Sequence, residues 1–425
     1  MDPANHPRQE QLEERSPFDL PGVRKSQARL KDLDPWVLET QVELTAIPAP
    51  PFGEGPRGDR MGELFEQVGL AQVRKDEVGN VLAELPGPWK YTEESGPSAG
   101  EPPQKGPHPG TPPALIISAH LDTVFPPGTD VSPQWQGGIV RAPGIADDAR
   151  GLATLLALGR VLTEVRTPLP FPLLLAATVG EEGEGDLRGV RHLFREGGPG
   201  QGARGFISLD GVGLERVITR GVGSTRLRIT LRGPGGHSWA DWGLPNPIHQ
   251  LGRVVSSMGD LPTPDSPRTT ATVAKWGGGK SINAIPQQAW VEIDLRSEGP
   301  EELSALEAAL LQECERVLTR PGQNEESSPH QLELELQELG RRPAGRSETS
   351  SPLVEAAVRA TRTLGVEPRL TSASTDANIP MSLGIPAITL GAGGEAGGIH
   401  TLDEWYSNEK GPEGILRAYL TLVLL

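Results

Sequence analysis

Apolar runs and helical patterns alternate over the first half of the chain. The run ALIISAHLDTV at 114–124 predicts a buried strand, and the segments 171–179 and 205–209 are similarly apolar. Helical patterns at 151–164 and 187–194 separate these strands. Because strands that alternate with helices favour parallel pairing, this part of the sequence predicts an α/β fold, with a mostly parallel sheet flanked by helices.

Both ends of the chain continue this pattern. Residues 28–68 resemble two helices separated by a Pro- and Gly-rich break, and a strand is expected in NVLAELPG. Near the C-terminus we expect a helix at 351–364, a short strand in PAITLG after Gly384, and a last helix near 414–425. The alternating domain is therefore expected to be discontinuous.

A different pattern lies between these two parts. From about residue 217 the expected order is strand, helix, strand, strand, helix, strand, which is typical of a compact, ferredoxin-like α+β module. We therefore assign 215–341 to an inserted domain, and 27–214 with 342–425 to the discontinuous one. Residues 1–26 are expected to be a polar extension, and residues 86–113 a Pro- and Gly-rich insertion.

Composition narrows the range of partners. The chain has 425 residues and a net charge of −16, and it lacks the clustered Lys and Arg that bind nucleic acid, so no nucleic-acid partner is expected. No segment is apolar enough for a signal peptide or a membrane span, so we expect a cytoplasmic protein without membrane contact. The single cysteine, Cys314, excludes intramolecular disulfides and cysteine-rich metal sites. Any metal must therefore be held by His, Asp and Glu.

Histidine and acidic side chains follow the expected strands. His120 and Asp122 stand at the end of the first buried strand, and strand alternation would place them on one face, where the carboxylate can orient the imidazole. Ligands of a parallel sheet collect at the carboxyl ends of its strands. Five residues have the chemistry and placement of a two-metal site: His120, Asp147, Glu182, Asp210 and His400.

A two-metal site divides the work among its ligands. One carboxylate bridges two divalent cations, and a histidine and a further carboxylate complete the ligands of each. The cations share a water, lower its pKa and polarise a carbonyl group. Glu181, beside the expected ligand Glu182, is then the natural general base. The nearby Asp148 and Glu184 could have a structural role instead of a role in metal binding or catalysis, because acidic residues at such positions often cap helices.

The sequence resembles the dinuclear zinc exopeptidase and deacylase family, peptidase family M20, which includes peptidase T, carboxypeptidase G, aminoacylase and carnosinase. The resemblance extends from about Asp32 to the C-terminus. It is carried, in the family's order and spacing, by SAHLDTV, GIADDARG, TVGEEGEGD, LDG, GPGGHSW, GGGKSINAIPQQAWVEIDLRS and GIHTLDEW.

The resemblance implies a role for each residue of the site. Asp147 would bridge the two metals, His120 and Asp210 would complete one site, and Glu182 and His400 would complete the other. Glu181 would be the general base, with Asp122 as the partner that orients His120. Zn²⁺ is the expected metal, and Co²⁺ or Mn²⁺ would suit the same ligands.

In this family the inserted domain mediates homodimerisation. The resemblance implies that His237 reaches the active site of the partner subunit and stabilises an oxyanion. It also implies that Asn283 and Arg296 hold a substrate carboxylate, a task that suits the guanidinium fork. For Arg296 an alternative remains, a strand-end salt bridge with Asp294 or Glu292. The Gly-rich GAGGEAGG before His400 could let backbone approach the substrate closely.

These observations predict a metal-dependent hydrolase of amide bonds in small peptides, similar to an aminopeptidase or dipeptidase. Cleavage of tripeptides, as by peptidase T, is a more specific hypothesis, prompted by Asp210 in its LDG context. Two alternatives remain. The same residues could deacylate an N-acyl amino acid, or the chain could be a non-catalytic, metal-binding relative, although a carboxylate such as Glu181 beside the metals would then serve no purpose.

Overall fold

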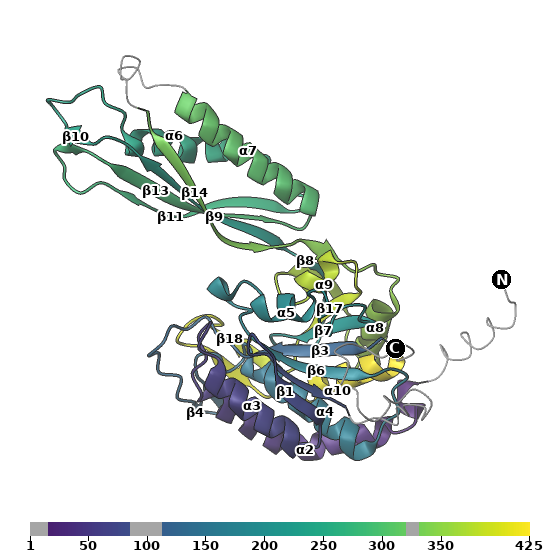
Figure 1. Cartoon of the computed structure of the whole chain (residues 1–425). Helices are drawn as coiled ribbons and strands as arrows, with labels where there is room; N and C mark the ends of the chain where they lie inside the picture. Colours follow the sequence, from purple (N-terminus) through teal and green to yellow (C-terminus); the bar gives the residue numbers. More distant parts are fainter. Residues whose placement is uncertain (1–15, 86–112, 320–330) are drawn as a thin grey trace, which may run out of the picture. The chain divides into compact units, whose positions relative to one another are not determined.

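The computed structural model describes residues 16–85, 113–319 and 331–425 (Figure 1). It divides into two compact units: one runs up to Thr219 and resumes as Arg346–Leu425, and the other is Arg220–Gly345. From the sequence, these boundaries were expected after residues 214 and 341. The first boundary lies later because β8 (Arg216–Gly221) pairs with a strand of the first unit's sheet.

The central sheet belongs to the first unit. Among the described residues it has the strand order β1-β2-β6-β3-β7-β17-β8-β15, with β16 paired to β8. Its middle strands β6, β3, β7 and β17 are parallel, and antiparallel pairs flank them. Besides β8, the strands are β1 (Ala71–Lys75), β2 (Val81–Glu84), β3 (Leu115–His120), β6 (Leu173–Thr178), β7 (Gly205–Leu209), β15 (Gly345–Arg346), β16 (Arg369–Ala373) and β17 (Ala387–Leu390).

Helices cover both faces of this sheet, which confirms the predicted fold class. They are α2 (Val23–Thr45), α3 (Gly55–Gln67), α4 (Ala149–Val165), α5 (Arg188–Leu193), α8 (Pro352–Thr363), α9 (Asn378–Ser382) and α10 (Gly411–Leu424). Short 3-10 turns lie at Pro17–Asp19, Gly183–Gly185 and Met258–Asp260. Helix α3 begins inside the stretch expected to be a break, because Pro at its start suits a first helical turn.

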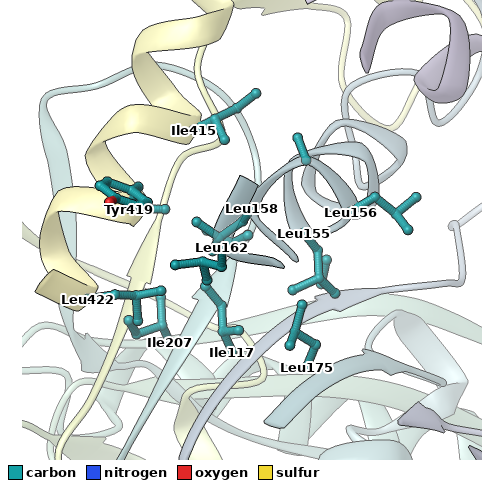
Figure 2. Packing of buried hydrophobic residues seen from close by; sticks show 14 of the residues in the cluster. Ile117, Leu155, Leu156, Leu158, Leu162, Leu175, Ile207, Ile415, Tyr419 and Leu422 are labelled. Atoms are coloured by element: carbon teal, nitrogen blue, oxygen red, sulfur yellow. The ribbon is translucent and has the colours of Figure 1, made fainter. Parts of the chain in front are cut away.

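Alternate residues of β3 pack into separate cores. Ile117 contacts the large core that α4 and α10 fill, where Leu155, Leu158 and Tyr419 lie (Figure 2). Its neighbour Ile116 belongs to a second core with residues of α5 and α9. Because successive side chains of a strand point to opposite faces, burial on both faces explains the unbroken apolar run that the sequence displays.

The N-terminal boundary differs from the prediction. Helix α2 begins at Val23, inside the segment expected to be a polar extension, and Val23 is fully buried in the large core. Ordered packing therefore starts before residue 27. Residues 1–15 of that extension, and the expected insertion at 86–113 apart from Pro113, lie outside the described residues.

The second unit has the predicted βαββαβ order. Its antiparallel sheet has the strand order β11-β13-β9-β14, and α6 and α7 both pack against β9 and β13. The elements are β9 (Gly223–Arg232), α6 (Pro247–Ser257), β11 (Thr269–Gly278), β13 (Gln288–Ser297), α7 (Pro300–Thr319) and β14 (Glu333–Arg342), with a small ladder of β10 (Gly236–His237) and β12 (Ala284–Ile285). The stretch 217–233, expected to be one strand, is divided between β8 and β9.

A second sheet of the first unit was not predicted. It has the strand order β18-β19-β5-β4, built from β4 (Gln134–Gln136), β5 (Ile139–Arg141), β18 (Glu395–Gly397) and β19 (Trp405–Ser407). The pairing of β5 with β19 joins segments more than 260 residues apart, with Tyr406 opposite Val140. This sheet brings the loop after β5 beside the loop before β19. Nowhere in 16–85, 113–319 and 331–425 is there a helix with the length and hydrophobicity that a membrane crossing needs.

Candidate active site

Three neighbouring parallel strands deliver the first set of site residues. His120 is the last residue of β3, Asp210 directly follows β7, and Glu181 and Glu182 lie just after the end of β6. Because β6, β3 and β7 are adjacent and parallel, their carboxyl ends share one edge of the sheet. The structure thus brings these residues together, as the sequence indicated.

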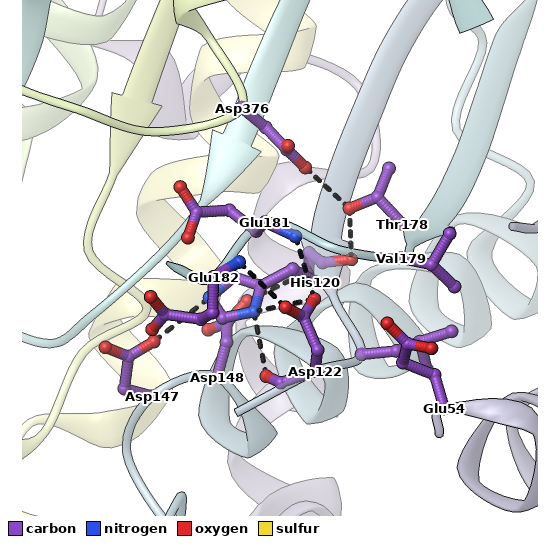
Figure 3. Close-up of polar contacts among 12 residues, drawn as sticks. Glu54, His120, Asp122, Asp147, Asp148, Thr178, Val179, Glu181, Glu182 and Asp376 are labelled. Carbon is purple, nitrogen blue, oxygen red and sulfur yellow. Dashed lines mark hydrogen bonds and ion pairs between the residues drawn. The ribbon is translucent and has the colours of Figure 1, made fainter. Parts of the chain in front are cut away.

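Asp147 lies at the centre of the cluster. Its Oδ1 is 3.0 Å from Nε2 of His120 (Figure 3). Its Oδ2 is 2.9 Å from Nε2 of His400. The same Nε2 of His400 is 2.9 Å from Oε1 of Glu182. One carboxylate therefore contacts two imidazoles through its two oxygens, an arrangement suited to a residue that bridges two cations.

The donor atoms fit a pair of divalent cations. Ligand atoms of His120, Asp147 and Glu182 lie within 4.8 Å of one another, and so do those of His120, Asp148 and Asp210. His400 contacts both Asp147 and Glu182, so all five predicted ligands belong to one connected cluster. Two imidazoles and several carboxylates are the donors that Zn²⁺ and similar ions accept.

The electrostatics of the cluster favour bound positive charge. Burial and the neighbouring charge of Asp147 raise the pKa of Asp210 to about 7. Hydrogen bonds to Asp147 and Glu182 raise the pKa of His400 to about 10. Burial opposes ionisation of Asp147, but hydrogen bonds from His120 and His400 outweigh it and hold its pKa below the usual range. A cluster of several carboxylates attracts cations.

Asp122 supports the site in a second way besides the predicted one. The fully buried carboxylate accepts hydrogen bonds from the backbone N–H groups of Glu181, at 2.9 Å, and Glu182, at 2.7 Å. Nδ1 of His120 lies 3.0 Å from the backbone carbonyl of Asp122 and 3.7 Å from its carboxylate. The Asp122 carboxylate therefore keeps the predicted ion pair with the imidazole, and the backbone carbonyl adds a closer contact.

Glu181 and Glu182 share this anchored loop. Both residues are more than 90% buried. In Figure 3 the Glu182 carboxylate lies beside Asp147, whereas the Glu181 carboxylate points to another side of the loop. A Glu-Glu pair can therefore direct one side chain to a cation and keep the other for proton transfer.

Asp148 caps a helix, the structural alternative that the sequence left open. Its Oδ1 accepts from the backbone N–H of Gly151 in the first turn of α4, and its Oδ2 accepts from the backbone N–H of His120, both at 3.0 Å. The residue is fully buried. Asp148 therefore joins the start of α4 to the end of β3, directly beside the cluster.

Sequence reasoning missed several buried residues that shape the site. Glu404 accepts backbone hydrogen bonds from the Asp147 loop, and burial raises its pKa to about 7. Arg150 donates to the carbonyl of Ala392 at 2.9 Å, and Arg417 donates to that of Gly391 at 2.6 Å. In the sequence, these residues stand out only as charged residues within motifs that are otherwise buried.

The Gly-rich segment before His400 has a packing reason. A Cβ at Gly394 would meet the ring of Tyr406 at 2.4 Å, and one at Gly393 would meet the backbone of Gly411 at 2.6 Å. Both glycines also have positive φ, 78° and 79°. These contacts, rather than an approach to substrate, account for the two glycines.

The remaining predicted residues lie in the second unit. His237 is exposed on β10, opposite Ala284 of β12, and the backbone N–H of Ser238 donates to the carbonyl of Asn283 at 3.0 Å. Nδ1 of His237 accepts from the backbone N–H groups of Trp239 and Ala240, at 3.2 and 3.4 Å. With Nδ1 accepting, the ring proton resides on Nε2, which can donate.

Arg296 lies apart from this pair, at the other end of β13. Its Nε donates to the carboxylate of Asp294 at 2.7 Å, the strand-end contact considered as its structural alternative. The side chain is nevertheless 41% exposed. The second unit thus brings His237 and Asn283 together and keeps Arg296 away from them.

Known proteins resemble the whole chain. It is 26% identical over 299 residues to the uncharacterized protein YqjE of Bacillus subtilis, which is 68% of this chain and 75% of that protein. The fold of the present chain is similar to that of aminopeptidase PepT from Bacillus cereus, with a TM-score of 0.70 and 22% identity. The match covers 94% of this chain and 98% of PepT. A tripeptidase from Staphylococcus aureus has a TM-score of 0.73 and 22% identity over 92% of this chain and 98% of its own.

The sequence model of Peptidase family M20/M25/M40 matches residues 116–424, far more than half of the chain. This range includes every residue of the cluster around Asp147. The chain therefore belongs to peptidase family M20/M25/M40 and is a hydrolase of that family.

Proposed function

We propose that this protein is a metal-dependent exopeptidase that cleaves short peptides with a free amino terminus. The observation that carries this proposal is the contact of Asp147 with His120 and His400 through its two oxygens, with Glu181 and Glu182 on an anchored loop beside it. The names of two proteins with a similar fold, an aminopeptidase and a tripeptidase, support the choice of a small peptide as substrate.

Two divalent cations would be held by the residues of the cluster. His120 and Asp210 would hold one, Glu182 and His400 the other, and Asp147 both. Zn²⁺ is our choice of metal, and Co²⁺ or Mn²⁺ would fit the same donors. When bound, such cations lower the pKa of water and polarise a carbonyl group.

Glu181 would move the proton. Its carboxylate takes a proton from the water that attacks the scissile carbonyl, and then gives that proton to the nitrogen of the leaving amine. Asp122 would keep this base in place, because its carboxylate holds the backbone N–H of both Glu181 and Glu182. The anchor therefore acts on the backbone atoms of the loop that carries the base.

We further propose that the active enzyme is a homodimer in which His237 and Asn283 serve the partner's site. Arg296 is eight residues along β13 from Gln288, which follows the β12 strand that pairs with His237. At about 3.3 Å per residue this separates His237 from Arg296 by roughly 25 Å. A dipeptide spans only about 7 Å. One second unit therefore cannot place both residues on one substrate, and this supports the proposal that a second copy supplies one of them.

In a dimer the three residues would have separate tasks. Nε2 of His237, left as the donor, would stabilise the oxyanion that forms at the scissile carbonyl. Asn283 and Arg296 would hold a substrate carboxylate, with Arg296 exchanging its contact with Asp294 for the substrate. The resemblance to the family implies these roles, and the chemistry of each side chain agrees with them.

The substrate class is tested with a panel of dipeptides, tripeptides and N-acyl amino acids, each with added Zn²⁺, Mn²⁺ or Co²⁺. We expect hydrolysis of di- or tripeptides, and loss of it when the same peptide is acetylated at its amine. Cleavage of N-acyl amino acids alone would instead establish the deacylase alternative. Bound metal without turnover of any amide would indicate the non-catalytic one.

The shared site is tested by mixing two inactive variants, Glu181→Gln and His237→Ala. In a mixed dimer one site would combine an intact Glu181 with an intact His237, so we expect part of the wild-type activity to return. The control mixes two separately purified samples of Glu181→Gln, which should stay inactive. If subunit exchange is demonstrated by mass spectrometry and no activity returns, His237 does not act across the dimer.

A further inference from the structure

We infer that Glu404 is a positioning residue that holds the bridging carboxylate of Asp147 in register with His400. This inference rests on the proposed two-cation site. Glu404 is fully buried, and it stands only four residues after His400 in the sequence. Its role would be to join two loops that each supply a ligand.

Both oxygens of the Glu404 carboxylate accept hydrogen bonds from the loop that carries Asp147. Oε2 accepts from the backbone N–H of Gly144 at 2.9 Å. Oε1 accepts from the backbone N–H of Ala146 at 2.8 Å and of Asp147 itself at 3.1 Å. An ionised carboxylate forms strong hydrogen bonds to N–H donors, so three of them fix the orientation of the peptide that carries Asp147.

The backbone of Glu404 adds a further contact to the same loop. Its carbonyl accepts from the N–H of Ala142 at 3.1 Å, directly beyond the pairing of β5 with β19. On its other side, the N–H of Glu404 donates to the carbonyl of Thr401 at 3.3 Å, which closes a turn next to His400. Glu404 therefore lies where a strand pair becomes two ligand loops.

Together, these contacts connect Asp147 and His400 by two routes. From the backbone of Asp147 the path leads to the Glu404 side chain, along the turn to His400, and from Nε2 of His400 back to Oδ2 of Asp147 at 2.9 Å. On the far side of Asp147, Asp148 is fixed by hydrogen bonds to α4 and β3. Asp147 is thus held from both directions, as a ligand of two cations requires, because rotation of its peptide would move both oxygens.

Glu404→Gln tests this inference with little change in side-chain size. The amide retains one acceptor oxygen, but its NH₂ group must face N–H donors on the other side. The hydrogen bonds on that side are therefore lost. We expect Co²⁺ affinity, measured by competition with a chromophoric chelator, to fall by roughly ten- to a hundredfold. The visible absorption spectrum of bound Co²⁺ should change as well, because the ligand geometry changes.

A matched control separates positioning from general destabilisation. Asn408→Ala removes contacts in the same segment, where Asn408 donates to Asp34 at 2.9 and 3.0 Å and accepts from the hydroxyl of Tyr406 at 3.0 Å. These contacts do not involve the Asp147 loop. At a comparable loss of melting temperature in the metal-free protein, Asn408→Ala should retain wild-type Co²⁺ affinity and spectrum.

The outcomes distinguish this inference from the proposed function. If wild-type protein does not bind two Co²⁺ ions, the two-cation site itself is wrong. If the wild type binds two and Glu404→Gln binds them with the same affinity and spectrum, the positioning role of Glu404 is wrong. Equal losses of affinity in Glu404→Gln and Asn408→Ala would also overturn it, because stability alone would then explain both.

Discussion

Glu181→Gln is expected to lower kcat on the order of 10²–10⁴-fold, the usual contribution of a general base. Glutamine cannot take a proton from water, so the chemical step loses its proton acceptor. Metal content should stay at the wild-type level, because the loop is held through the backbone N–H groups of Glu181 and Glu182 on Asp122. Steady-state kinetics and metal analysis on the same sample measure both quantities.

A suitable control lies in the same loop. Glu184 is exposed in the short turn Gly183–Gly185, so Glu184→Gln removes a charge near the site without removing the proposed base. We expect this variant to retain activity close to that of the wild type. Wild-type turnover in Glu181→Gln would rule out the general-base role, whereas lost metal would mean that Glu181 is itself a ligand.

Asp147→Ala is expected to abolish binding of both cations and, with it, measurable turnover. The substitution removes the oxygen that contacts His120 and the oxygen that contacts His400, so each half of the site loses a ligand. Elemental analysis of the purified variant after dialysis should find far less than one cation per chain. Circular dichroism should remain native, because the buried cap of α4 is Asp148 and not Asp147.

Asp210→Ala provides the comparison for this result. Asp210 groups with His120 and Asp148, whereas Asp147 groups with His120 and Glu182. We therefore expect its loss to weaken one cation and leave the other in place. Two full equivalents of metal in Asp147→Ala would contradict a bridging role, and equal losses in both variants would show that the two positions are not independent.

The elements with the strongest apolar patterns were predicted well. Strand β7 has the expected bounds, and α4 extends only two residues before and one beyond the expected helix. These elements are buried on nearly all sides, so their apolar runs are long and continuous. The short strands β5 and β19 were missed because each has only three residues, too few to show a periodic pattern.

The residues of the site were found for a related reason. His120, Glu182 and Asp210 follow strands whose pattern is plain, so their convergence could be expected from the parallel order alone. The contacts around these residues could not be expected from the sequence. The Asp122 carboxylate lies 3.7 Å from the His120 imidazole, as expected, but it also accepts from the backbone N–H of Glu181, which the sequence does not indicate.

By itself, the sequence determined the α/β class, the inserted α+β module and the identity of the residues that meet around Asp147, because hydrophobic periodicity and strand ends are local properties of the chain. Only the tertiary structure decided which atoms of those residues touch, and which buried groups hold them. Glu404 reaches the backbone of Asp147 across 257 positions. A hydrogen bond over such a distance depends on how sheets and loops pack, and packing leaves no trace in the spacing of residues.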